Sequence, residues 1–122
     1  MLNNKLTSIV NEHNKYASLA LKWYSPVELG ITNNDDIADV ANKTPRNSVV
    51  ELWISDDSLF GRNIRKELSN LYPDFFGYLT VRWTVDLQNC HFEAFAYKSG
   101  ERFFKTYTKI NGENWGPWKK VC

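Results

Sequence analysis

The first 23 residues carry the pattern that most constrains what this chain can fold into. Apolar or bulky side chains recur there at alternating steps of four and three, the spacing of a heptad seam. They are Leu2, Leu6, Ile9, His13, Tyr16, Ala20 and Trp23. The residues between them are mostly polar, so a lone helix would leave the seam exposed to water. We predict a helix over residues 3–23 that stops at Ser25-Pro26, together with a partner that covers its seam.

Identical copies of the chain are the partner that this spacing favours. In a parallel homotrimer, all seven seam residues would lie at the interface. Three converging His13 imidazoles could then hold an anion or water, or titrate together below neutral pH. About three heptads is short for a coiled coil, so packing of the same helix within one globule is the alternative.

Composition narrows the class of protein. The 122 residues suit one ordinary domain, and a formal net charge of +1 argues against nucleic acid as a partner. No apolar stretch is long enough to span a membrane, and no secretory signal is visible, so we expect no membrane partner. The two cysteines, Cys90 and Cys122, show no metal-ligand spacing and are interpreted as reduced thiols.

The remainder of the chain reads as a mainly antiparallel β domain. Thr32 with Asp35 three residues later resembles a capping box and predicts a short helix near 34–42. A short helix or ordered loop fits 58–73, closed by Pro73. Strands are predicted over 49–54, 78–85, 91–97, 102–110 and 115–121, with Asn111-Gly112 as the strongest hairpin signal. The predicted fold is therefore α+β: a helical trimerisation segment over 1–24, then a β-rich knob with one or two short helices over 25–122.

The end of the chain carries a distinctive motif. Arg102-Phe103-Phe104-Lys105-Thr106-Tyr107, the Asn111-Gly112 turn and Trp115-Gly116-Pro117-Trp118-Lys119 follow one another. This run resembles the closing hairpin of knob domains in bacteriophage tail fibres and pyocin-like tail proteins. Leu29-Gly30-Ile31-Thr32 and the stretch from Pro73 to Val81 look like earlier parts of such knobs, so the resemblance covers 29–122. It implies a fibre protein, generally a homotrimer, in which Lys105 stands where the family has Arg.

Two groups of side chains are candidates for ligand binding. Tyr78, Arg82, Lys105 and Tyr107, with Lys109, are predicted on polar faces of neighbouring strands, where they could bind a glycan, a wall phosphate or an acidic surface. Trp115 and Trp118 could stack on a sugar ring, or could cap the open end of the sheet, and the family resemblance favours the second role.

No catalytic group is predicted. The carboxylates Asp35, Asp36, Asp39, Asp56 and Asp57 lack the order of a calcium loop, and no local spacing establishes a glycosidase pair. Cys90 and His91 are adjacent in a predicted strand and would point to opposite faces. We therefore expect a protein that is not an enzyme and that has no metal and no cofactor.

These expectations lead to one functional hypothesis and two rivals. The leading one is a structural and receptor-binding module of a phage tail or fibre, which attaches the virion to a host cell-surface glycan or wall polymer; three weak sites on one axis would give firm attachment. It would be assembled in the host cytoplasm and located in the virion beside other tail, baseplate or fibre proteins. One alternative is an assembly or fibre-trimerisation protein that docks on another virion component without binding a receptor. The other is an accessory domain of a cell-wall hydrolase.

Overall fold

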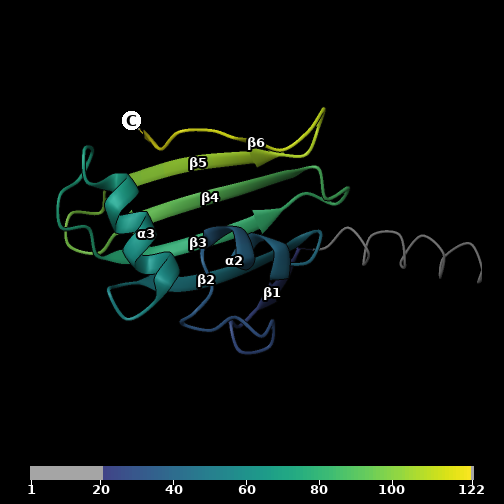
Figure 1. Cartoon of the computed structure of the whole chain (residues 1–122), viewed down its shortest axis with the longest axis horizontal. Coiled ribbons are helices and arrows are strands. Elements are labelled where there is room, and N and C mark those ends of the chain that lie inside the picture. Colours follow the sequence, from purple (N-terminus) through teal and green to yellow (C-terminus); the bar gives the residue numbers. More distant parts are fainter. Residues whose placement is uncertain (1–20, 122) are drawn as a thin grey trace, which may run out of the picture.

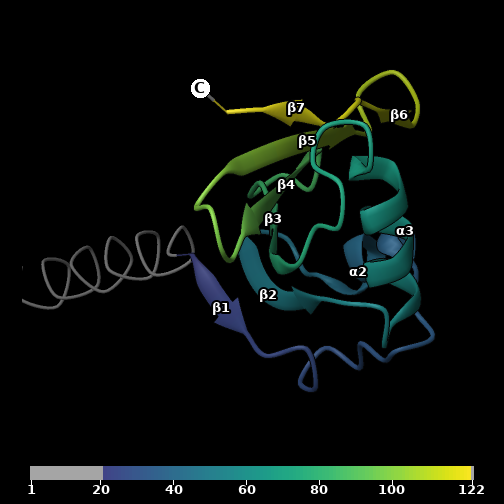
Figure 2. The ribbon, with the colours of Figure 1, turned by 90° about the vertical axis from the view of Figure 1, so that its left-hand side faces the viewer.

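The computed structural model describes residues 21–121 as a small α+β domain, in which two short helices lie on one face of a seven-stranded sheet (Figures 1 and 2). This confirms the predicted class and the two short helices. The elements in chain order are β1 (Lys22–Tyr24), α2 (Ile37–Lys43), β2 (Ser48–Ile54), α3 (Leu59–Leu68), β3 (Gly77–Trp83), β4 (Asn89–Ala96), β5 (Arg102–Thr108), β6 (Asn114–Trp115) and β7 (Lys119–Lys120).

The beginning of the sheet differs from expectation. Lys22 and Trp23, predicted to be helical, belong to β1, which pairs in parallel with β2 through Trp23 and Val49. Trp23 is 65% exposed there. The prediction of a helix through Trp23 is wrong because backbone pairing with β2 takes precedence over the heptad pattern at its last position. Leu2, Leu6, Ile9, His13, Tyr16 and Ala20 lie outside the described residues, so the coiled coil and the homotrimer stay predictions.

The sheet is mixed, with the strand order β1-β2-β3-β4-β5-β6. β1 runs parallel to β2, and every other pairing is antiparallel, as the predicted C-terminal meander requires. The expected last strand over 115–121 is divided into β6 and β7, which both pair with β5. The break falls at Gly116-Pro117, where proline has no N–H to donate to a ladder.

Alternation along the strands separates a covered face from an open one. Leu79, Val81 and Trp83 of β3 are buried, whereas Tyr78 and Arg82 are exposed. The first set packs with the inward side chains of the other strands and of α2 and α3 into one core. We call the side opposite the two helices the open face of the sheet (Figure 2). Within residues 21–121, no helix has the length and apolar character needed to cross a bilayer.

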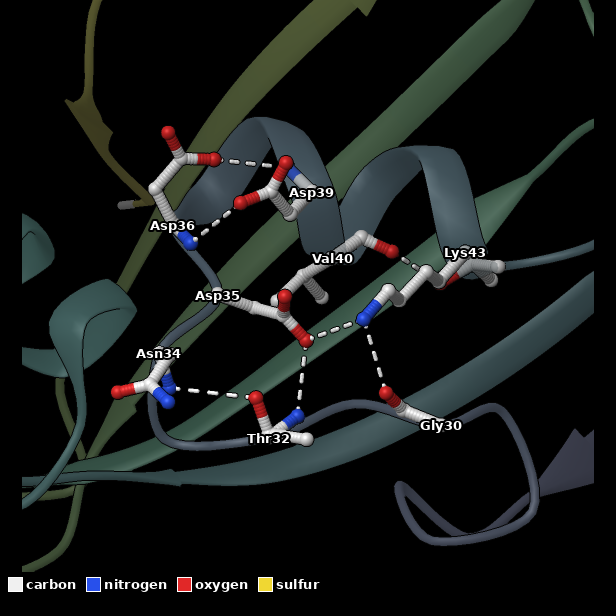
Figure 3. Close-up of polar contacts among 9 residues, drawn as sticks. Gly30, Thr32, Asn34, Asp35, Asp36, Asp39, Val40 and Lys43 are labelled. Carbon is white, nitrogen blue, oxygen red and sulfur yellow. Dashed lines mark hydrogen bonds and ion pairs between the residues drawn. The ribbon is translucent and has the colours of Figure 1, made fainter.

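Helix α2, at Ile37–Lys43, begins three residues later than the predicted start near residue 34. Its N-cap is Asp36, whose side chain accepts a hydrogen bond from the backbone N–H of Asp39, and Asp39 accepts one from the N–H of Asp36 (Figure 3). The expected box of Thr32 and Asp35 is therefore wrong. Asp35 instead accepts hydrogen bonds from Thr32 N–H and from Lys43 Nζ, both at 2.8 Å, and so ties the preceding loop to the end of the helix.

This arrangement predicts a pH-dependent contribution to stability. The hydrogen bond from Lys43 and that from Thr32 N–H lower the pKa of Asp35 below its usual value. A lowered pKa stabilises the folded state above the unfolded pKa of about 3.9, and this gain is lost as the pH falls through the folded value. We expect Asp35→Asn to cost about 1 kcal/mol at pH 7 and much less near pH 2.

Urea denaturation at the two pH values measures this difference. Asp74→Asn is the matched control, because the Asp74 side chain is 95% exposed. If Asp35→Asn lowered the free energy of unfolding equally at both pH values, the stabilising role of the ionised Asp35 carboxylate would be contradicted.

Candidate functional site

The four strand residues predicted to share polar faces do not lie together. Tyr78 and Arg82 of β3 are on the open face, as expected. Lys105 and Tyr107 of β5 point to the opposite side, where they are 8% and 4% exposed and Tyr107 belongs to the core. The prediction that these four side chains occupy solvated faces is therefore wrong for β5. Lys109 lies beyond the end of β5, with its ammonium 5.0 Å from the centre of the Trp83 ring.

Lys105 is the centre of a packed polar cluster. Its ammonium lies 2.8 Å from Glu67 Oε1 on α3. The same ammonium lies 5.3 Å from the centre of the Trp115 ring and 5.9 Å from that of the Trp118 ring. Trp118 Nε1 approaches the other oxygen of Glu67 at 3.4 Å. This cluster connects helix α3 to strand β5 and to residues 115–118.

The two tryptophans of the family-like motif pack against this cluster. Trp118 is 9% exposed. The Trp115 ring packs against the rings of Tyr107 and Phe92, with ring centres 4.3 and 5.6 Å away, respectively. Burial raises the pKa of Tyr107, and the nearby Glu113 carboxylate raises it further. These contacts give both tryptophans a packing role, while a ligand contact by Trp115, which is 40% exposed, stays a prediction.

A different set of aromatic side chains is exposed at the other end of the sheet. Trp53, Phe76, Tyr78 and Tyr97, which we call the aromatic cluster, are each between 39% and 63% exposed. The Trp53 ring packs edge-on against the rings of Tyr78 and Tyr97, with ring centres 5.0 and 5.9 Å away, respectively. Large apolar rings that gather on a surface mark a binding site more often than a folding requirement.

The strand register builds the aromatic cluster. Trp53 in β2 lies directly opposite Tyr78 in β3. Tyr97 follows β4, and its backbone N–H donates to the carbonyl of Phe76 at 3.0 Å, which brings these two residues together. The guanidinium of Arg65 lies 4.0 Å above the Phe76 ring and holds it from the side of α3.

A cavity of about 350 Å³, which we call the aromatic cavity, opens within this cluster. Its walls are Trp53, Tyr72, Phe76 and Tyr97, and its polar groups come from Asp74 and Lys98. A few polar groups among aromatic walls, in a cavity of this size, are typical of a site for a small ligand. Flat rings suit a ligand with an apolar face, and the carboxylate and ammonium suit hydroxyl groups at its rim.

The structure gives other candidate groups local roles. Asp56 pairs with Arg65, and Asp36 and Asp39 cap α2. No group of three or more potential metal ligands occurs among residues 21–121. Cys90 is buried and His91 is exposed, as predicted for opposite faces, and burial raises the pKa of the Cys90 thiol to about 12.

Sequence reasoning found only Tyr78 in the aromatic cluster. It missed Trp53, Phe76 and Tyr97, which are contributed by three separate parts of the chain. Trp53 did carry a signal: it stands between Leu52 and Ile54 in a predicted strand, so alternation would place it opposite two apolar side chains. Phe76 and Tyr97 flank strands and could be placed only once the β3–β4 register was known.

Comparisons with known proteins give no relative for this chain. No protein-family model, no curated protein and no solved structure matches it.

Proposed function

We propose that this domain is a recognition module that binds a saccharide in the aromatic cavity. The observation that supports the proposal is the exposed aromatic cluster around Trp53, which is held by strand pairing and borders a cavity with Asp74 and Lys98 at its polar side. Pyranose rings have an apolar C–H face and a rim of hydroxyl groups, which matches flat indole and phenol rings beside one carboxylate and one ammonium.

The resemblance of the C-terminal hairpin to phage tail-fibre knobs gives this binding a biological setting. We propose that the module belongs to a phage tail or fibre and attaches it to a glycan or wall polymer of the host surface. A cavity of about 350 Å³ holds little more than one sugar unit, so a single site would bind weakly. Several copies on one fibre would convert weak binding into stable attachment, which is the role we propose for the homotrimer.

Replacing Trp53 tests the proposal. We expect Trp53→Ala to lower the affinity for a bound oligosaccharide about 30-fold, because a central aromatic side chain contributes about 2 kcal/mol at such a site. The measurement is a calorimetric or NMR titration of the chain with oligomers of glucose, N-acetylglucosamine and glucosamine at millimolar concentration.

Trp23→Ala is the matched control. Trp23 is also an exposed tryptophan of the same sheet, but it lies in β1, away from the cavity, and its removal should leave the affinity unchanged. Both variants should unfold at nearly the same temperature as the unmodified chain. Binding that survives Trp53→Ala, or no binding of any of these oligomers, would refute the proposed function.

A further inference from the structure

A second cavity adjoins the aromatic cavity and shares one wall with it. It has a volume of about 350 Å³ and lies between β2, the loop that follows β1, and the start of α3. We call it the acidic groove. Ile31, Leu52 and Phe60 supply apolar walls, Glu51 and Asp57 supply carboxylates, and Trp53 lines both this groove and the aromatic cavity.

The charge of the acidic groove is one-sided. None of the described residues that line it is a lysine, an arginine or a histidine. Several other carboxylates form ion pairs, for example Glu67 with Lys105 and Glu93 with Arg102. Among residues 21–121, neither Glu51 nor Asp57 forms an ion pair. The Asp57 carboxylate accepts one long hydrogen bond, from the Ser55 hydroxyl at 3.5 Å. A cation that entered the groove would therefore meet two carboxylates with which no cationic side chain of the described part of the chain is paired.

Strand geometry places one of these carboxylates beside the indole. Glu51 and Trp53 are two residues apart in β2 and so project on the same face, with Cα atoms about 6.6 Å apart. A positive charge at this spacing is attracted both by the carboxylate and by the negative face of the indole ring. The aromatic cavity, which Trp53 also lines, contains Lys98 beside Asp74, so its charges balance and it carries no excess of carboxylates that would attract a cation.

We propose that the acidic groove receives a protonated amine, so that the saccharide bound at Trp53 is an amino sugar with a free, unacetylated ammonium group. This inference rests on the proposed function, because it assigns the substituent that lies next to the stacked ring. The chemical class is a hexosamine unit of a polymer whose amino groups are not acylated. Acetylation would remove the charge and add bulk, and both changes would weaken the fit to the groove.

Three oligomers of equal length separate the possibilities. Oligomers of glucosamine, N-acetylglucosamine and glucose share the backbone linkage and differ at one ring position. The comparison is made at about pH 6, where most free amines of the glucosamine oligomer carry a proton. We expect the glucosamine oligomer to bind the 122-residue chain at least 10-fold more tightly than the other two.

Charge-neutralising variants test which residues produce the preference. Glu51→Gln and Asp57→Asn should each reduce the preference for glucosamine about 3-fold or more, while the affinity for the glucose oligomer stays the same. Glu93→Gln is the control for net charge, because Glu93 lies in β4 on the open face and is held by Arg102. This variant should keep the full preference.

The outcomes distinguish the two proposals. Equal affinity for all three oligomers, lost in Trp53→Ala, would overturn the amine inference and leave the proposed function in place. Tighter binding of the acetylated oligomer, or a preference that Glu93→Gln removes as effectively as Glu51→Gln, would also overturn the inference. Failure of all three oligomers to bind would overturn both proposals.

Discussion

Trp83→Ala is expected to lower the free energy of unfolding by about 3–5 kcal/mol, enough to remove much of the stability of a domain of this size. Trp83 is 1% exposed and belongs to the core, so its removal leaves a large cavity between the sheet and α2. Its indole N–H also donates a 2.7 Å hydrogen bond to the carbonyl of Ala41, which docks the end of α2 on β3. Chemical denaturation followed by circular dichroism measures the loss.

Two further variants separate packing from hydrogen bonding at this position. Trp83→Phe keeps most of the ring volume but removes the hydrogen-bond donor to Ala41. We expect it to lower the free energy of unfolding by about 1–3 kcal/mol, because it leaves a buried carbonyl unpaired and opens only a smaller cavity. Trp23→Ala removes an exposed indole and should change stability by less than about 0.5 kcal/mol. A Trp83→Ala penalty as small as that of Trp23→Ala would contradict the core position of Trp83.

Glu67→Met is expected to cost about 2–3 kcal/mol, more than removal of its partner Lys105. Without the carboxylate, the ammonium of Lys105 stays in a site where its side chain is only 10% exposed, and the indole N–H of Trp118 loses its acceptor. Lys105→Met instead leaves a carboxylate whose side chain is 36% exposed and can be hydrated, so about 1 kcal/mol is expected. The same denaturation measurements apply.

The double variant provides the control for this pair. Lys105→Met combined with Glu67→Met removes both charges and fills the space with apolar side chains, which is often nearly neutral for a buried pair. We expect the double variant to be more stable than Glu67→Met alone. Equal costs for the two single variants, simply added in the double, would show that the pair is not coupled.

Local pattern predicted the central strands because it was unambiguous there. In β3, apolar Leu79, Val81 and Trp83 alternate with Tyr78 and Arg82, and only one assignment of faces buries the apolar set. The turns at 86–89 and 98–101 then fix which strands are neighbours. The α+β class and the antiparallel meander follow from these two kinds of signal.

Strand β5 shows why the same reasoning failed for part of the site. Phe103 and Tyr107 alternate with Phe104 and Thr106, so both faces of β5 carry aromatic side chains and the pattern does not select one. Because lysine is rarely buried, the sequence predicts a solvent-facing position for Lys105. Its actual burial depends on Glu67, 38 residues earlier in the chain, and no local pattern reports that partner.

Strand β1 and most of the aromatic cluster could not be predicted from the sequence, for related reasons. A three-residue parallel edge strand such as β1 has no period of its own, and Trp23 fitted the heptad spacing equally well. Trp53, Phe76 and Tyr97 meet only because β2, β3 and β4 pair in one register. Cross-strand neighbours are properties of the sheet rather than of any one segment.

The order of the strands also determines how the domain would respond to mechanical tension. The described chain enters the sheet at β1, on one margin, and leaves it at β7, on the other (Figure 2). A pull between Lys22 and Val121 would therefore load the two-residue β7 and the three-residue β1 before the longer inner strands. The longer strands β3, β4 and β5 would yield last, so a stretched domain would fray from its margins while its central ladder stayed intact.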